Sequence, residues 1–525
     1  MKKLFLTLVM VVLSLGLIFV GTPETAAAAA PAKPTSTPTP TVRYGGVLKI
    51  LYSRDHVSFG YPPLITGIGI SLGRPALEPL LDFDSDWNFK PTYLATNWKV
   101  APDGLSATIT LRKGVKFHDG TDFNAEAVKW NLEKEKENKV SGTDTWKSIE
   151  VVDNYTVRIH LTRFDVTLPQ ILSFSTAPGF MVSPTAYAKN GQDWMMTHPV
   201  GTGPYKLKSF TQDVSAIYER FEDYWGGKPY LDGVEYHFMT DAMVQTAALR
   251  SGAGHVAYTT IPQYAKELKD LGYNVAAPMN SIITINPDSR NADSPMANQK
   301  VREALEYAID REAIAKLGFG YWRAAYQWAM PEYPMGYNAD LQGRKYNPAK
   351  AKQLLAEAGY PNGFKTTLIA DVTHNLMDPL TAVQSYWKAV GVDAAVNQFP
   401  RAQYVQLRSQ GWHNGYIDLN NLVVPMYISV IPKLLPAQYT RPLLVSTLKP
   451  PGYAEAIAQA VGTRDFSLLK ARTQAVVKML YDNATVLPLY SLCDPIAMDK
   501  SVRDSGFGGV KSVYLWSPEK VWLNK

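Results

Sequence analysis

The sequence predicts an α/β protein built from more than one lobe. Three observations lead to this prediction: the chain has 525 residues, its first third is rich in strand patterns, and its later part repeats a helix followed by a strand. At about 150 residues per domain, this length predicts several packed units with ample core. Helices that alternate with strands are typical of an α/β lobe.

The strand patterns begin early in the chain. Val47–Tyr52 is a short apolar-rich segment, and Leu105–Leu111 alternates polar and apolar residues as a half-buried strand does. Val151–Leu161 is predicted to form a strand, a turn and a second strand. Tyr205–Lys208 follows a Gly-Pro turn and is predicted to be a further strand.

Helix signals appear from the middle of the chain onwards. Asp241 is a typical N-cap for a helix that runs to Arg250, with Gly252 just beyond its end. Residues 301, 304, 305 and 308 are apolar at helical spacing, and Asp310 is predicted to cap the next helix, Arg311–Lys316.

Two more helices are bounded by their capping residues. Asn347 and Pro348 open one helix and Gly359 closes it, with an apolar face at positions 351, 354, 355 and 358. A second helix runs from Asp378 to Gly391 and leads into a predicted strand at 392–399. We find no internal repeat of fixed period.

The composition excludes several classes of protein. Thirty tyrosines, twelve tryptophans and thirty-six glycines exclude a disordered polymer. The single cysteine, Cys493, excludes an internal disulfide and a cysteine-rich zinc site. The net charge of +6 is small for this length and no long basic block occurs, so the sequence does not favour nucleic-acid binding.

The amino terminus is predicted to be an export signal. A positive start at Lys2 and Lys3 precedes an uncharged apolar stretch, Leu4–Val20, and an alanine run, Ala26–Ala30, in which we expect cleavage. We therefore assign 1–30 to a signal peptide, with an uncleaved membrane anchor as the alternative. No cysteine lies near this region, so we expect no lipid anchor there. Residues 31–42 are rich in Pro and Thr and are predicted to be an extended spacer.

Catalytic and metal motifs are weak in this chain. Gly69–Gly73 has the G-x-S-x-G spacing of a nucleophile elbow around Ser71, but its surroundings indicate a loop without the required preceding strand. Asp82–Asn88 begins like a calcium loop, but it lacks the glycine and the final glutamate that such a loop needs, and a polar hairpin turn is the better interpretation. The eight histidines show no ligand spacing, and no ATP-binding P-loop is present. We predict no catalytic residues, no metal and no cofactor.

Several segments together resemble one family, the family 5 extracellular solute-binding proteins of ABC importers, which includes oligopeptide-, dipeptide- and nickel-binding proteins. The resemblance runs in order from Gly45 to Tyr490. Its segments are 45–48, 78–88, 94–98, 103–105, 111–120, 123–128, 199–205, 224–230, 301–304, 308–311, 349–360 and 487–490. The most specific are LRKGVKFHDG at 111–120 and PVGTGPY at 199–205. Their glycines suit tight turns, which in the first segment flank Lys116 and His118, two residues expected to be exposed.

The resemblance implies a periplasmic-binding-protein-like α/β fold, with two lobes joined by a hinge and an inserted subdomain in lobe one. Lobe one would comprise 43–83, 199–285 and 489–525, the inserted subdomain 84–198, and lobe two 286–488. The family's members capture a solute between the closing lobes and deliver it to membrane permease subunits. The resemblance therefore implies a binding protein rather than an enzyme, acting as a monomer outside the cytoplasmic membrane.

One departure from the family bears on the ligand. Peptide binders of the family place an aspartate in lobe two, in a motif resembling W-x-A-D-Y, where it pairs with the peptide's ammonium group. Here the preceding strand is matched by Gly415–Leu419, but no Asp or Glu occurs from Leu419 through Ala454. Because an unpaired buried charge is costly, this pocket should disfavour a free amino terminus. Asp418, or a carboxylate from elsewhere, remains a possible substitute.

The family's architecture places further residues near the cleft. Aromatic and polar side chains there suit a neutral, amphipathic or sugar-like ligand, or a hydrophobic peptide, and Arg323 could pair an anionic group. The predicted ligand-binding residues are Asp55, His56, Trp322, Arg323, Trp328, Trp412, Tyr416, Asp418 and Tyr427. Ordinary core packing is the alternative for each aromatic residue. Two other functions stay open: an exported serine hydrolase that uses Ser71, and a receptor that senses a ligand without transport.

Overall fold

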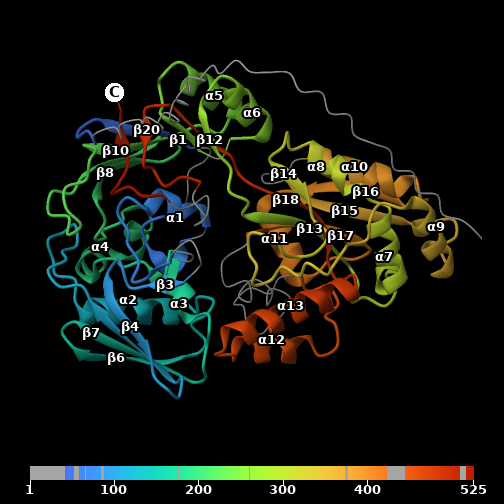
Figure 1. Ribbon diagram of the computed structural model, residues 1–525, viewed down its shortest axis with the longest axis horizontal. Coiled ribbons are helices and arrows are strands. Elements are labelled where there is room, and N and C mark those ends of the chain that lie inside the picture. The colour runs from blue at the N-terminus through green and yellow to red at the C-terminus, as the bar shows by residue number, and fades with distance from the viewer. Residues whose placement is uncertain are drawn as a thin grey trace, which may run out of the picture. The chain divides into compact units, whose positions relative to one another are not determined.

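The structure is a computed structural model that describes residues 42–52, 58–65, 67–83, 88–174, 177–258, 260–372, 377–422, 444–508 and 516–524. Val42–Lys525 forms one compact unit. Three sheets dominate it, with seven, six and four strands (Figure 1). The α/β prediction is confirmed.

The seven-stranded sheet is centred on β1 (Val47–Tyr52), whose bounds are those predicted from the sequence. β1 lies parallel to β10 (Gly233–Phe238) and to β11 (Val256–Tyr258). The remaining strands are β8 (Tyr205–Thr211), β9 (Ser215–Arg220), β12 (Asn274–Ala276) and β19 (Ile496–Met498), in the order β12-β19-β11-β1-β10-β9-β8. α5 (Ala242–Arg250) and α6 (Pro262–Asp270) accompany this sheet (Figure 1).

The six-stranded sheet has the order β14-β18-β13-β17-β15-β16. Its strands are β13 (Ser281–Pro287), β14 (Trp322–Ala324), β15 (Lys365–Asp371), β16 (Asp393–Phe399), β17 (Gly415–Leu422) and β18 (Leu487–Leu492). Ile283 and Ile285 pack into one core cluster and Ile282 into another, as expected for a strand buried on both faces.

Helices cover both faces of this sheet. One core cluster contains residues of α7 (Gln299–Tyr307), α8 (Arg311–Lys316), α9 (Pro348–Glu357) and α10 (Met377–Lys388). The other contains residues of α11 (Arg401–Gln410), α12 (Tyr453–Val461) and α13 (Phe466–Asp482). In Figure 1 the strands accordingly lie between α8 and α10 on one side and α12 and α13 on the other.

The four-stranded sheet is antiparallel, in the order β4-β5-β7-β6. Its strands are β4 (Ala95–Val100), β5 (Ser106–Leu111), β6 (Trp146–Asp153) and β7 (Thr156–Leu161). Around it lie α2 (Ala125–Glu137), α3 (Leu168–Ile171), α4 (Pro184–Thr197) and the hairpin β2 (Asp82–Phe83) with β3 (Phe89–Lys90). The remaining elements are α1 (Gly67–Gly73), the pair β20 (Val502–Arg503) and β21 (Trp522–Leu523), and three short 3₁₀ turns at Pro62–Leu64, Ala177–Gly179 and Pro295–Ala297.

Several local predictions are confirmed by capping contacts. Asp241, Asp310 and Asn347 each accept a hydrogen bond from a backbone N–H in the first turn of α5, α8 and α9. Gly359 follows α9 with φ +91°, as a left-handed C′ residue does. The predicted hairpin around Asp82–Asn88 is present as β2 and β3, although residues 84–87 are not described.

Two local expectations are wrong. Gly69–Gly73 lies within helix α1 and not in a loop, and Ser71 is fully buried there.

The imidazole Nε2 of His118 lies 2.9 Å from the carbonyl oxygen of Gly203, and its ring packs edge-on against Phe221. Burial lowers the pKa of His118 to about 4, so the side chain is neutral at physiological pH and not an exposed cation.

The motifs shared with the family converge on a buried carboxylate, Glu78. It accepts hydrogen bonds from the Tyr224 hydroxyl at 2.7 Å, the Trp225 indole N–H at 2.7 Å and the Thr202 hydroxyl at 2.8 Å. These four residues come from segments 78–88, 199–205 and 224–230, far apart in the chain. The same segments also contact the part of the chain that carries the four-stranded sheet, since the Ala95 N–H donates to the carbonyl oxygen of Leu80 at 3.0 Å and the His118 N–H to that of Gly201 at 2.9 Å.

The glycines of the second motif are required by close backbone approach. A Cβ on Gly201 would lie 2.1 Å from the carbonyl oxygen of Ala76, and one on Gly203 would lie 2.5 Å from that of Pro75. Real Cβ atoms do not tolerate such distances, so any larger residue displaces backbone at this junction.

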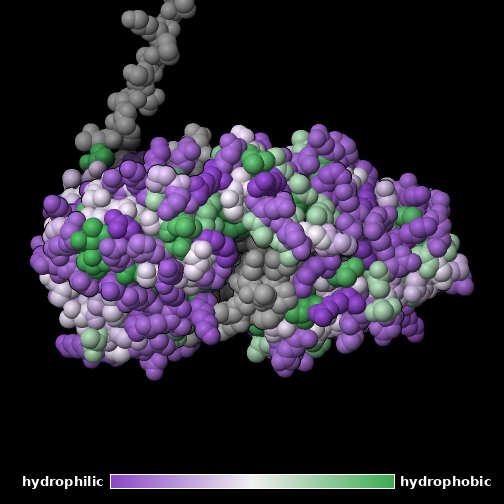
Figure 2. Space-filling view, turned by 90° about the horizontal axis from the view of Figure 1, so that it is seen from below, coloured by the Kyte–Doolittle hydropathy of each residue, from purple (hydrophilic) through white to green (hydrophobic). Residues whose placement is uncertain are grey.

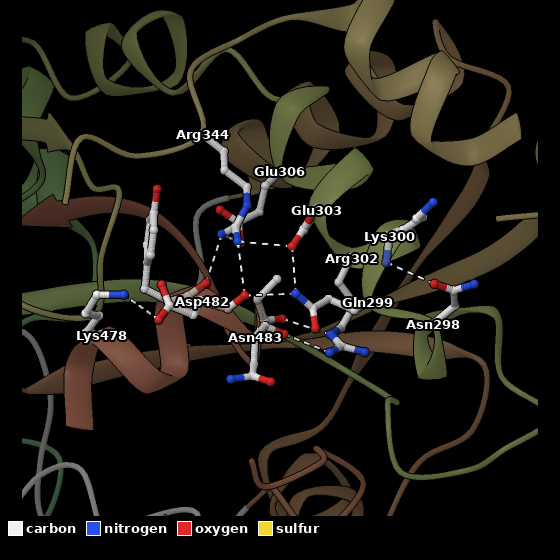
Figure 3. A network of polar contacts seen from close by, with 12 residues as sticks. Asn298, Gln299, Lys300, Arg302, Glu303, Glu306, Arg344, Lys478, Asp482 and Asn483 are labelled. Carbon is white, nitrogen blue, oxygen red and sulfur yellow. Dashed lines mark hydrogen bonds and ion pairs between the residues drawn. The ribbon is translucent and has the colours of Figure 1, made fainter. Parts of the chain in front are cut away.

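A polar network anchors α7 to the end of α13 (Figure 3). Arg302 donates to the carbonyl oxygens of Asn483 at 2.7 Å and Ala484 at 3.0 Å, and Gln299 donates to that of Asp482 at 2.9 Å. Arg344 adds a bond to the Tyr481 carbonyl at 3.0 Å. Cationic donors at the carboxyl end of a helix satisfy its last carbonyl groups and complement its dipole.

Candidate ligand-binding site

The chain passes between the seven- and six-stranded sheets through two short segments. Residues 277–280 connect β12 to β13, and residues 493–495 connect β18 back to β19. The two segments lie side by side, since the Asn280 N–H donates to the carbonyl oxygen of Leu492 at 3.2 Å. A pair of adjacent connections of this length is a hinge geometry.

The carboxyl ends of β1, β10 and β11 lie at the same edge of the seven-stranded sheet because these strands are parallel. In α/β sheets this edge is where ligands bind. Two buried hydroxyl groups follow these strands, those of Ser58 and Thr260, and neither has a hydrogen-bond partner in the described part of the chain. The Thr260 N–H donates to the carbonyl oxygen of Pro495 at 2.9 Å, which places it beside the second connection.

Cys493 opens the second connection. It is buried, and its thiol lies 3.4 Å from the carbonyl oxygen of Tyr321. Burial, with a smaller contribution from the charge of Asp494, raises the pKa of the Cys493 thiol to about 12. A thiol in this environment is a structural residue and not a nucleophile.

On the side of the six-stranded sheet, Asp418 is almost fully buried in β17, opposite Ile285. The Tyr404 hydroxyl donates to its backbone carbonyl oxygen. Burial raises the pKa of Asp418 to about 8, and the negative charge of Asp371 adds to the rise. A carboxyl group that is largely protonated at neutral pH is a poor counter-charge for an ammonium group.

Trp412 and Tyr416 are buried in the core around the six-stranded sheet. The Trp412 indole N–H donates to the carbonyl oxygen of Gly415 at 3.1 Å. The Tyr416 ring packs against Trp387 with centroids 4.8 Å apart. Both side chains are thus engaged in packing, and a contact with ligand stays a prediction for them.

Trp322 and Arg323 lie in the edge strand β14. The Trp322 ring stacks on Tyr490 at 4.4 Å, in the core. Arg323 is half exposed and forms a 2.5 Å ion pair with Glu332. It lines a pocket of about 290 Å³ together with residues of the segment 324–345, including Met330. Trp328 belongs to the same segment and is buried in the second core cluster.

The sequence did not single out Asn280 and Asn421. Both are fully buried, and neither amide atom of Asn280 nor the Oδ1 of Asn421 has a hydrogen-bond partner among the residues described. The indole N–H of Trp328 shares this property. Unsatisfied buried polar groups cost about 1–3 kcal/mol each, so they mark places where a further polar group is expected to bind. The sequence signal that could have identified these residues is an amide side chain at the end of an otherwise apolar strand.

Asp55, His56 and Tyr427 lie outside the described residues. Among the residues that are described, no group of three or more His, Cys, Asp or Glu side chains could hold a metal ion. Within the same residues, none of the helices has both the length and the apolar character needed to cross a bilayer. The face seen in Figure 2 is mostly hydrophilic, and its apolar residues lie in small separate areas.

The fold is that of the periplasmic binding proteins. The chain superposes on DppA of Helicobacter pylori, an ABC transporter-associated periplasmic binding protein solved with the peptide STSA. The TM-score is 0.79 at 24% identity, covering 92% of this chain and 99% of that one. It is similar to the dipeptide-binding protein of Pseudoalteromonas sp. SM9913, solved with Met-Leu (TM-score 0.80, 23% identity, 91% and 100% covered). NikA of Brucella suis, solved with Fe(III)-EDTA, gives a TM-score of 0.80 at 22% identity, with 91% and 100% covered.

The chain belongs to the bacterial extracellular solute-binding proteins, family 5, whose middle-region profile matches residues 91–430. The glutathione-binding protein GsiB of Salmonella typhimurium is 37% identical over 345 residues, 63% of this chain and 65% of that protein. GsiB of Shigella flexneri serotype 5b is 36% identical over 347 residues, 63% and 66% of the two chains. The match to the Salmonella protein thus spans just under two thirds of its length.

Proposed function

We propose that this protein is the extracytoplasmic solute-binding component of an ABC importer. It captures a small organic or peptide-like solute between two closing lobes and delivers it to membrane permease subunits. Lobe one comprises 43–83, 199–285 and 489–525, lobe two comprises 286–488, and 84–198 form the inserted subdomain. The protein acts as a monomer, with no enzymatic step of its own, after export directed by residues 1–30.

The observation that carries this proposal is the pair of adjacent connections at 277–280 and 493–495 between two separate α/β sheets. Two short adjacent connections permit the sheets to rotate about them while each core stays intact. Family membership supports the same function. The hydrolase alternative receives no support, because Ser71 lies inside a helix and is fully buried.

The ligand class follows from the unpaired buried polar groups near these connections and after β1. Ser58, Thr260, Asn280 and Asn421 offer uncharged donors and acceptors, and the nearby carboxyl group of Asp418 is held largely protonated. Such a site favours hydroxyl, amide or other neutral hydrogen-bonding groups over a free ammonium group. We therefore propose that ligand binding does not require a free amino terminus.

The test begins with native mass spectrometry of the purified protein, which reports a co-purified solute directly. A thermal-shift screen follows with glutathione, the tetrapeptide Ser-Thr-Ser-Ala, its amino-acetylated form and a set of oligosaccharides. A ligand at 100 times its Kd stabilises the protein by about 2.7 kcal/mol. We expect acetylation to leave the affinity for the tetrapeptide unchanged or improved. A loss of affinity on acetylation would show that a carboxylate pairs with the ammonium group, against the proposed ligand class.

The transport role is tested separately with the permease in proteoliposomes. Liganded binding protein should stimulate ATP hydrolysis by the permease complex. Ligand binding without any stimulation would favour a sensing receptor over an importer component.

A further inference from the structure

The turn between β4 and β5 meets the corner between α12 and α13. Arg464, in that corner, donates hydrogen bonds from both terminal nitrogens to the carbonyl oxygens of Pro102 and Asp103 in the turn. Its guanidinium group also lies 5.2 Å from the centroid of the Phe164 ring. A planar guanidinium that binds two carbonyl groups and an aromatic face at once is a geometrically specific contact.

Other contacts surround Arg464. The Val166 N–H donates to the carbonyl oxygen of Val461 at 3.3 Å. Phe89 and Val166 are partly buried against the core cluster that contains residues of α12 and α13. The interface therefore has an exposed cation, a backbone hydrogen bond and apolar contacts.

The turn on the side of the four-stranded sheet is rigid. Asp103 accepts a hydrogen bond from the Leu105 N–H at 2.9 Å, and the Gly104 N–H donates to the Ala101 carbonyl at 2.8 Å. These bonds hold the two carbonyl groups that Arg464 binds. A preorganised acceptor pair loses little conformational entropy when the contact forms.

The corner on the side of the six-stranded sheet is equally ordered. Arg472 donates to the Thr463 hydroxyl at 2.6 Å and to the Gln459 carbonyl at 2.8 Å. Asp465 caps α13 by accepting from the Leu468 N–H at 2.7 Å. The backbone that carries Arg464 is thus fixed by its neighbours on both sides.

Gly104 fits this contact for two reasons. Its φ of +71° lies in the left-handed region, which favours glycine. A Cβ at this position would also lie 2.5 Å from Nη2 of Arg464 and 2.9 Å from the Phe164 ring. Gly114 has a similar φ of +75° but open space around its Cβ position, so it has the backbone constraint alone.

We propose that Arg464 and the β4–β5 turn form a clasp between the inserted subdomain and lobe two, which holds the lobes closed and slows ligand release. The four-stranded sheet is attached to lobe one by backbone hydrogen bonds, from the Ala95 N–H to the Leu80 carbonyl at 3.0 Å and from the His118 N–H to the Gly201 carbonyl at 2.9 Å. In contrast, α12 and α13 pack on the sheet of lobe two. Any opening about the connections at 277–280 and 493–495 must separate the clasp. The role of the clasp in ligand release rests on the proposed function, and its contacts are tested without ligand.

The first experiment compares the ligand-free wild type with Arg464→Ala. Hydrogen exchange at the Val166 amide should accelerate by about tenfold in the variant, since this amide is protected only while the clasp is formed. Spin labels introduced by Lys99→Cys and Glu455→Cys, in a Cys493→Ala background, should show a shift to longer distances. Lys470→Ala removes an exposed cation from α13 and should change neither measurement. Unchanged exchange and unchanged distances in Arg464→Ala would overturn the clasp.

A second pair of variants guards against a general loss of stability. Gly104→Ala should reproduce the effect of Arg464→Ala on exchange and distance, whereas Gly114→Ala, with equal backbone constraint, should not. Equal behaviour of the two glycine variants would overturn the proposal. Where a ligand has been found, the clasp further predicts a dissociation rate about tenfold faster in Arg464→Ala. If Arg464→Ala binds ligand and its dissociation rate is unchanged, the proposed function stands and the clasp is refuted.

Discussion

Replacing Glu78 by glutamine should change how stability depends on pH. Burial raises the pKa of Glu78 to about 7, against 4.5 for the exposed group. Between these two values the folded state holds more protons than the unfolded state, so stability falls as pH rises. At 1.36 kcal/mol per pKa unit, the difference corresponds to about 3 kcal/mol between pH 4.5 and pH 7.

Glutamine cannot titrate, so Glu78→Gln should lack this component. Its amide also presents an N–H group to donors, and the loss of one or two of the three hydrogen bonds at Glu78 should cost about 1–3 kcal/mol each. The variant should therefore be the less stable protein at pH 5. Its deficit should shrink by about 3 kcal/mol on going to pH 8.

Thermal unfolding of both proteins across pH 5–8 provides the measurement. With an unfolding entropy of roughly 2 cal/mol/K per residue, 3 kcal/mol corresponds to about 3 °C for a chain of this size. Since both proteins share every other titrating group, the difference between their Tm values isolates Glu78. Parallel Tm profiles over this range would refute the reasoning, as would a deficit that grows with pH.

Three further outcomes follow from the packing. Gly201→Ala should destabilise the protein by about 2 kcal/mol or more, because its Cβ would lie 2.1 Å from a backbone oxygen; an unchanged denaturation midpoint would contradict this. Arg302→Leu should cost about 3 kcal/mol in urea unfolding because it leaves buried carbonyl groups without donors, whereas Gln299→Ala, at an exposed position, should cost under about 1 kcal/mol. Cys493 should not react with a maleimide at pH 8 until the protein unfolds, because the thiol is buried and its pKa is raised to about 12; rapid labelling of the folded protein would show that the connection opens.

Features with local causes were predicted well from the sequence. The caps at Asp241, Asp310 and Asn347 depend on one side chain and the N–H groups within the next three residues. The alternating burial of β5 and β7 likewise follows from the pleat of a single strand. For such elements, most of the interactions that stabilise the structure form between residues close together in the sequence.

Helix α1 shows where local reasoning fails. A segment with three glycines in seven residues is a poor helix former, since each glycine costs about 1 kcal/mol relative to alanine. The structure explains the helix by its packing. A Cβ on Gly69 would lie 2.4 Å from the carbonyl oxygen of Ser58, and one on Gly73 would lie 2.3 Å from that of Phe59. The glycines let the helix approach another backbone segment. This approach cannot be predicted from the residues of the helix alone.

The candidate site depends on contacts between distant segments, for a related reason. Asn280 and Asn421 become notable only when pairing of β13 with β17 brings them to the same end of one sheet and leaves both amide atoms of Asn280 and the Oδ1 of Asn421 without partners among the described residues. Trp412 and Tyr416 show how one residue type fits two interpretations. Their aromatic character suggested a ligand surface, but the same character suits a core, and pairing with Gly415 and Trp387 places them there.

The distribution of motif residues explains why family membership specifies the fold more sharply than the ligand. At the Glu78 junction a hydroxyl, a phenol and an indole each donate to the one carboxylate, and Gly201 and Gly203 are fixed by backbone contacts. Side chains whose hydrogen-bonding capacity is satisfied internally cannot also recognise a solute. Ser58, Thr260, Asn280 and Asn421, which have unused hydrogen-bonding capacity, lie outside the motif segments, whereas the unpartnered Nδ1 of His118 and hydroxyl of Tyr205 lie within them. Positions such as these four can therefore change with the ligand while the hydrogen bonds to Glu78 stay intact.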